Sequence, residues 1–278
     1  MTATQLPRTG SATGPVQPLT RTGIWILFWL AAANGLFLYL APGLADTDYA
    51  WSIKPAVNAA FIGAGFLAGT LATGLVLWRA KQWRTFSTLP VALWVLASTL
   101  ALATFIHADR FKWDYPLTWV WTAVYVGVPF AVPFLVWRQR RDAAAEPDAH
   151  CGLKVLRVIS AVVGVALLVG STALYVSPGL GDHWPWALTP LLARAVAAWY
   201  ALFGTMLVSC AIGLRRPHEA FIPYATLTCW SVLVLALPLL HPDDVSGGGA
   251  WYALMIALLV LGVAGLLRSA AAFFATRT

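Results

Sequence analysis

Charged side chains are scarce in this sequence. Lysine, arginine, aspartate and glutamate together make up 10% of its 278 residues, whereas 60% are hydrophobic and the mean hydropathy is +0.74. A soluble domain is about 25% charged and about half apolar, so this composition excludes an ordinary soluble protein, a disordered chain and a collagen-like fibre. It predicts an all-α, polytopic integral membrane protein whose main partner is the lipid bilayer.

Cysteine is also rare. Three thiols lie far apart, at Cys151, Cys210 and Cys229, with no CxxC pair and no histidine at metal-binding spacing. We therefore expect neither a disulfide framework nor a zinc site. Cys210 and Cys229 lie in apolar stretches, where a thiol behaves as a small hydrophobic group.

Catalytic signatures are missing as well. The sequence contains no Walker A motif, no Rossmann glycine pattern, no HExxH, no GxSxG and no DDxxD cluster. The net charge of +7 would suit nucleic acid in a soluble protein, but a membrane protein collects such cations on its cytoplasmic side. The sequence therefore predicts no nucleic-acid partner and no catalytic residue, and it identifies no cofactor.

Long hydrophobic runs dominate what is present. A bilayer core of about 30 Å needs about 20 apolar residues in a helix, and helices satisfy every backbone polar group within the segment. Eight runs qualify as transmembrane helices: 23–41, 54–78, 88–107, 117–137, 154–176, 189–213, 219–240 and 250–273. Pro129 and Pro133 are expected to kink the fourth of them.

Polar segments divide the chain into two four-helix units. Residues 1–22, rich in Thr, Pro and Gly, predict a disordered cytoplasmic tail. The first unit is predicted over 23–141 and the second over 154–278, with a polar cytoplasmic linker at 142–153.

The basic residues predict the orientation. With the amino terminus inside, the outer segments hold four cations, Lys54, Arg110, Lys112 and Arg194, so 14 of the 18 lie inside. Such an excess is typical of cytoplasmic segments. We expect a plasma-membrane protein with both termini in the cytoplasm. Arginine far exceeds lysine and alanine is abundant, which favours a bacterial source.

The two halves resemble each other in sequence. Residues 39–46 read YLAPGLAD, and residues 175–182 read YVSPGLGD, which is an offset of 136. Nearly the same offset joins further pairs: Gly69 with Gly204 and Phe86 with Phe221 at 135, and His107 with His241 and Asp109 with Asp243 at 134. This pattern predicts a tandem repeat of four helices, with small residues such as Gly65 and Gly69 at helix contacts.

Two cations on the outer side are candidate ligand-binding residues. Arg194 lies about one turn into the sixth run, and Lys54 begins the second. Ionisable groups beside apolar spans are costly to bury and often functional. Contact with a small anionic ligand or lipid competes here with snorkelling to the headgroups or a structural salt bridge.

Two histidines are the second set of candidates. His107 and His241 each end the third run of their unit, and each is followed two residues later by an acid, Asp109 or Asp243. Helix-end capping, a proton-accepting or ligand-contacting pair, and metal or haem ligation are the competing interpretations.

The expected function follows from these residues. We expect binding or transport of a small molecule or lipid in an outward-facing cavity between the two units. The alternatives are a membrane-embedded enzyme that uses the His/Asp pairs as acid and base and a haem-binding redox subunit.

Overall fold

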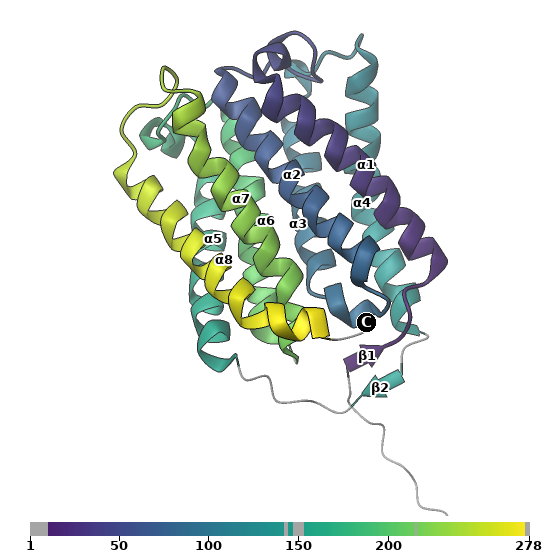
Figure 1. The fold of residues 1–278 in the computed structure, drawn as a ribbon. Helices are drawn as coiled ribbons and strands as arrows, with labels where there is room; N and C mark the ends of the chain where they lie inside the picture. Colours follow the sequence, from purple (N-terminus) through teal and green to yellow (C-terminus); the bar gives the residue numbers. More distant parts are fainter. Residues whose placement is uncertain (1–10, 142–143, 147–152, 215, 276–278) are drawn as a thin grey trace, which may run out of the picture.

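The computed structural model describes residues 11–141, 144–146, 153–214 and 216–275, and within these ranges it has eight helices long and apolar enough to cross a membrane (Figure 1). They are α1 (Pro18–Leu40), α2 (Ala56–Arg79), α3 (Leu89–Ile106), α4 (Pro116–Arg141), α5 (Lys154–Val176), α6 (Pro190–Gly213), α7 (Phe221–Leu240) and α8 (Gly249–Ala275). The prediction of an all-α, multi-pass membrane protein with eight transmembrane helices is confirmed.

Short elements join the helices at the two ends of the bundle. The 3₁₀ helices η2 (Trp83–Phe86) and η5 (Pro217–Ala220) lie at the end where the chain enters α1, called here the N-terminal end. At the opposite end lie η1 (Pro42–Asp46), η3 (Ala108–Arg110) and η4 (Pro178–His183). One small antiparallel ladder pairs β1 (Ser11–Thr13) with β2 (Ala144–Glu146).

The segment before α1 differs from the predicted disordered tail. Residues 1–10 lie outside the described ranges, but α1 begins at Pro18, five residues before its predicted start. The amide of Val16 donates to the carbonyl of Lys81, and the amide of Trp83 donates to that of Gly14. These backbone bonds order residues 14–17 across η2, a long-range contact that local composition does not reveal. Most of the predicted linker 142–153 lies outside the described residues.

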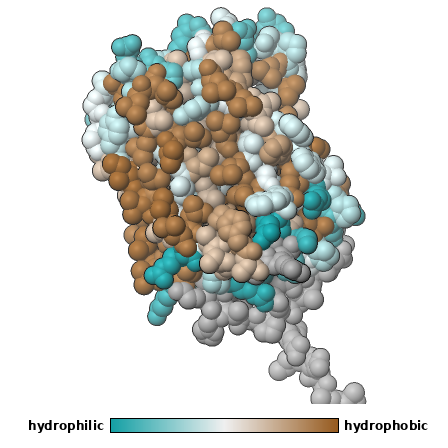
Figure 2. Space-filling view, viewed as in Figure 1, coloured by the Kyte–Doolittle hydropathy of each residue, from teal (hydrophilic) through white to brown (hydrophobic). Residues whose placement is uncertain are grey.

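The surface carries a broad apolar band. Figure 2 shows hydrophobic side chains over the middle of the bundle and hydrophilic ones gathered toward the two ends. Large apolar side chains of the spanning helices are exposed, such as Leu239 at 84% and Phe130 at 75%. In water such a surface would aggregate, whereas hydrocarbon chains solvate it without penalty. The band therefore fits a chain folded in a bilayer.

The helices pack in a reciprocal pattern. α1 packs on α2 and α5 on α6, while α2 packs on α7 and α6 on α3. Tyr39 at the end of α1 donates its hydroxyl to the carbonyl of Leu233 in α7, at 3.0 Å. Tyr175 at the end of α5 donates to the carbonyl of Thr99 in α3, at 2.8 Å. Each half thus binds a backbone carbonyl of the other half.

Small residues set the closest helix approaches. A Cβ at Gly65 in α2 would lie 2.6 Å from the ring of Trp199 in α6, so Gly65 serves the contact between the halves as expected. Gly69 differs, because a Cβ there would meet nothing within 4 Å. Gly164 and Gly204 face each other within the second half, where each Cβ would lie within 3 Å of the other's carbonyl.

Pro133 leaves one backbone carbonyl of α4 without its partner inside the helix. Pro133 has no N–H, so the carbonyl of Pro129, four residues earlier, loses its helical partner. The indole Nε1 of Trp94 in α3 donates to this carbonyl at 3.0 Å. A side chain of the neighbouring helix therefore satisfies the acceptor that the proline exposes.

Tyr224 fills the interior of the second half. Its side chain is fully buried, and its hydroxyl lies 2.8 Å from Ser160 Oγ in α5. A Cβ at Gly265 in α8 would lie 2.2 Å from Cγ of this ring. The missing side chain of Gly265 lets α8 pack on this ring, so the tyrosine occupies the space between α5, α7 and α8.

This packing predicts that Gly265→Leu destabilises the protein. Overpacking a filled interior costs about 1–3 kcal/mol, so the apparent thermal transition in detergent should fall. Gly170→Leu is the matched control, because a Cβ at this exposed position of α5 meets nothing within 4 Å. Equal transitions for the two variants would contradict the packing described here.

Candidate functional site

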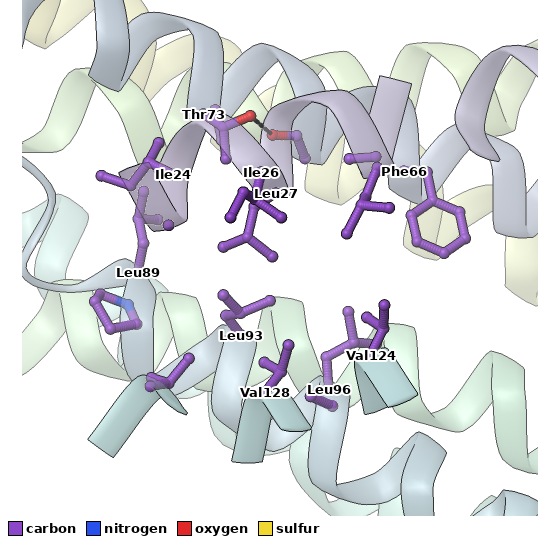
Figure 3. A pocket seen from close by; sticks show the side chains of 18 of the residues that line it. Ile24, Ile26, Leu27, Phe66, Thr73, Leu89, Leu93, Leu96, Val124 and Val128 are labelled. Atoms are coloured by element: carbon purple, nitrogen blue, oxygen red, sulfur yellow. Dashed lines mark hydrogen bonds between the residues drawn. The ribbon is translucent and has the colours of Figure 1, made fainter. Parts of the chain in front are cut away.

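A large cavity lies inside the first half of the bundle. Its volume is about 550 Å³, and it is lined by α1, α2, α3 and α4, with Trp199, Leu202 and Phe203 of α6. Figure 3 shows Ile24, Ile26, Leu27 and Phe66 on one side of an open space and Leu93, Leu96, Val124 and Val128 on the other. Most of the lining comes from the first unit, and residues of α6 together with Thr226 of α7 add a part of the second unit.

The lining is almost wholly apolar, and its polar groups mostly bond within the protein. Thr73 Oγ1 donates to the carbonyl of Gly69 at 2.8 Å. Asn34 donates to the carbonyl of Leu30 and accepts from the hydroxyl of Tyr49. The hydroxyl of Thr20 donates to Gln139 at the N-terminal end. Such a lining offers few hydrogen bonds to a polar ligand.

Aromatic side chains close both ends of this cavity. Trp83 and Phe86 of η2 line it at the N-terminal end, with their rings packed edge to face at 5.0 Å. Tyr49 and Trp121 line it at the opposite end, with ring centroids 5.9 Å apart. The cavity thus runs along the helices, and aromatic rather than charged side chains line it at both ends.

None of the six residues predicted to bind a ligand lines this cavity: Lys54, His107, Asp109, Arg194, His241 and Asp243 all lie in or near the opposite end. The structure brings two of them together. Nη1 of Arg194 lies 2.7 Å from Nε2 of His107, which joins α6 to the end of α3. The guanidinium also lies over the ring of Tyr175, 5.8 Å from its centroid.

The environment of His107 favours its neutral form. Partial burial lowers the pKa of the imidazole below its ordinary value of 6.5, and the positive charge of Arg194 lowers it further. The hydrogen bond requires the same state, because Nε2 can accept from Arg194 only when it carries no proton. Protonation would set two cations against each other.

Lys54 is held by a different group. Its Nζ lies 2.7 Å from Oδ2 of Asp46, and the lysine side chain is 67% exposed. Hydrogen bonds from Lys54 and Ser52 lower the pKa of the Asp46 carboxyl below its ordinary value. This is an ion pair at the surface, and surface pairs contribute little to stability.

The remaining candidates do not form the expected pairs. Asp109 forms an exposed ion pair with its neighbour Arg110, at 3.1 Å. In the part of the chain that the structure describes, no hydrogen bond joins His107 to His241, and none is found for the side chain of Asp243. α3 packs on α6 and α7 on α2, so the two histidines end helices with different neighbours.

A second cavity of about 460 Å³ lies at the opposite end, beside η4 and the loop before α8. Two carboxylates, Asp182 and Asp244, and two indoles, Trp184 and Trp186, line it. Oδ2 of Asp244 accepts from the amide of Val57 at the start of α2, at 3.1 Å. Within the described ranges, no three His, Cys, Asp or Glu side chains gather closely enough to hold a metal ion.

The most deeply buried charges among the described residues were not predicted from the sequence. Arg84 in η2 and Glu219 in η5 form an ion pair at 2.5 Å, with side chains 6% and 3% exposed. Glu219 Oε2 also accepts from the amide of Arg216. The two positions are 135 apart, which is the offset between Phe86 and Phe221. This spacing is the sequence signal for the ion pair, because the repeat offset assigns a base of one half and an acid of the other half to equivalent positions.

Comparison with protein-family models, with curated proteins and with solved structures gives no significant match for this chain.

The buried ion pair makes a prediction about stability. Arg84→Leu or Glu219→Leu alone removes one member of a buried ion pair, which costs about 3–5 kcal/mol. The double variant removes both charges, so its thermal transition in detergent should lie above that of either single variant. Additive losses in the double variant would show that the two side chains are not coupled.

Proposed function

We propose that the protein binds a membrane lipid, with a hydrocarbon chain of the lipid in the cavity of the first half. The observation that carries this proposal is the apolar cavity of about 550 Å³. Ligand pockets are about 300–1,000 Å³ in volume, so the space suits a molecule rather than a few waters. Its almost wholly apolar lining favours an occupant without polar atoms along its length.

The shape of the cavity favours a chain over a compact molecule. Thr20 and Asn34 both line it and are 14 residues apart in α1, which is about 21 Å at the rise of an α-helix. The hydrocarbon core of a bilayer is about 30 Å thick. A lipid chain that lies parallel to the helices would match the cavity length of about 21 Å.

Substituting Gly69 by leucine tests the proposal. Gly69 lines the cavity and has free space at its Cβ position, so the new side chain fills the cavity without displacing a helix. A phosphatidylglycerol with a photoreactive diazirine on one acyl chain should label the peptide 89–97 in the unmodified protein. The yield should fall several-fold in Gly69→Leu.

Gly170→Leu is again the matched control, because it adds the same side chain at an exposed position of α5. Its labelling should equal that of the unmodified protein. Labelling confined to the outer surface, for example at Phe130, or unchanged by Gly69→Leu, would refute the proposal.

We further propose that Arg194 and His107 contact an anionic headgroup at the opposite end, separately from the chain cavity. No carboxylate lies within ion-pair distance of Arg194 among the described residues, and a guanidinium has five N–H donors. A phosphate would neutralise this charge. Lys54 and Asp109 are engaged by neighbouring charges and contribute less to such a contact.

Arg194→Gln tests this second contact. Fewer phosphatidylglycerol molecules should remain bound in native mass spectra, while phosphatidylcholine retention should not change. Arg110→Gln is the control, since it also removes an arginine at the same end. Equal phosphatidylglycerol retention in both variants would exclude a specific role for Arg194.

The repeat and the orientation are also proposals. Offsets of 136 and 134 pair Tyr39 with Tyr175 and Thr99 with Leu233. They relate two hydrogen bonds that the structure contains, which supports a tandem duplication. With the termini in the cytoplasm of a cell bounded by this membrane, 14 of the 18 cations lie on the cytoplasmic side, which supports this orientation in a plasma membrane. Similar offsets pair Tyr224 with Leu89 and Ser160 with Ile24, so we expect one duplicated unit to have kept its cavity and the other to be filled.

A further inference from the structure

The cavity reaches the surface of the protein along α1 and α4. Several residues that line it are also exposed: Ile26 and Val120, at 56% and 48%, and the small residues Ala123, Gly127 and Ala131. A residue that lines an interior space and is exposed as well marks an opening. These residues lie within membrane-spanning segments, so the opening faces hydrocarbon rather than water.

The two helices touch mainly at the N-terminal end. Gln139 of α4 is 1% exposed, and its Oε1 accepts from the amide of Gln17 and from the hydroxyl of Thr20. Its Nε2 donates to the carbonyl of Pro15, at 2.8 Å. These three hydrogen bonds are called here the Gln139 clasp. Along the rest of their length, α1 and α4 make few contacts. The helices are therefore joined at one end and separated along the rest of their length.

The residues of α4 that line the opening are small, although α4 does not pack closely against α1 there. Ala123, Gly127 and Ala131 recur every four residues, so they share one face. Such a stripe lets two membrane helices approach closely, yet a Cβ at Gly127 would meet nothing within 4 Å. The opening between α1 and α4 that these three small residues line is called here the slot.

We infer that the lipid enters this cavity sideways from the bilayer, through the slot between α1 and α4, and that it comes from the leaflet at the opposite end of the bundle. This inference rests on the proposed lipid binding. A ligand dissolved in hydrocarbon reaches the slot without crossing water. Because the Gln139 clasp closes the N-terminal end, a headgroup stays at the η1 end while its chain extends toward Trp83 and Phe86.

Blocking the slot tests the route separately from binding. Ala123→Phe and Ala131→Phe place a ring in the opening and leave the deeper lining unchanged. With the diazirine lipid in vesicles, the rate of labelling at 89–97 should fall about tenfold, which corresponds to about 1.4 kcal/mol of added barrier. Long incubation should restore the yield. Ala33→Phe is the control, because Ala33 is exposed on α1 and does not line the cavity.

The outcomes separate the two proposals. Normal rates in both slot variants, with labelling still lost in Gly69→Leu, would overturn the lateral route and leave lipid binding intact. No cavity labelling in the unmodified protein would overturn both. A diazirine at the chain end should label Leu27 and Leu89, and one near the headgroup should label Val120. The reverse order would overturn the assignment of the leaflet.

Discussion

The absence of water from the hydrocarbon layer is the constraint on which this structure depends. A backbone amide or carbonyl there has no solvent partner, so each spanning segment must bond within itself and become a helix. At Pro133 the chain breaks this rule, and a side chain of another helix supplies the missing bond. Pro133 frees the carbonyl of Pro129, and Trp94 donates to it. This exception thereby becomes a contact between α3 and α4.

The same constraint explains how the two halves are held together. Apolar surface alone gives little preference for a neighbouring helix over a lipid chain, so specific contacts decide the arrangement. Tyr39 and Tyr175 each bind a carbonyl across the halves, and Arg84 binds Glu219 at the N-terminal end. Breaking a buried pair of charges is costly. The junction between the halves is thus built from a few polar bonds at defined depths, with Gly65 on Trp199 between them.

The two halves differ in how their interiors are packed, and the cavity follows from this difference. In the second half, Tyr224 fills the interior and Gly265 lets α8 close on it. In the first half, smaller aliphatic side chains such as Leu89 and Ile24 line an open space. Small residues can serve either purpose, since the same lack of a side chain permits close approach at Gly65 and leaves a void at Gly69.

Hydrophobicity and helix length were enough to predict eight spanning helices with ends close to those observed, because lipid solvation acts on each segment independently. The ordered residues 14–17, the Arg84–Glu219 pair and the meeting of Arg194 with His107 could not be predicted in this way. Each joins residues at least 65 positions apart in the chain, and no local pattern reports such a distance. The position of the cavity likewise depended on tertiary structure, because a void is defined by what neighbouring helices fail to fill. The polar residues that composition singled out lie at the end of the bundle, whereas the space for a ligand lies among the apolar residues that composition treats as equivalent.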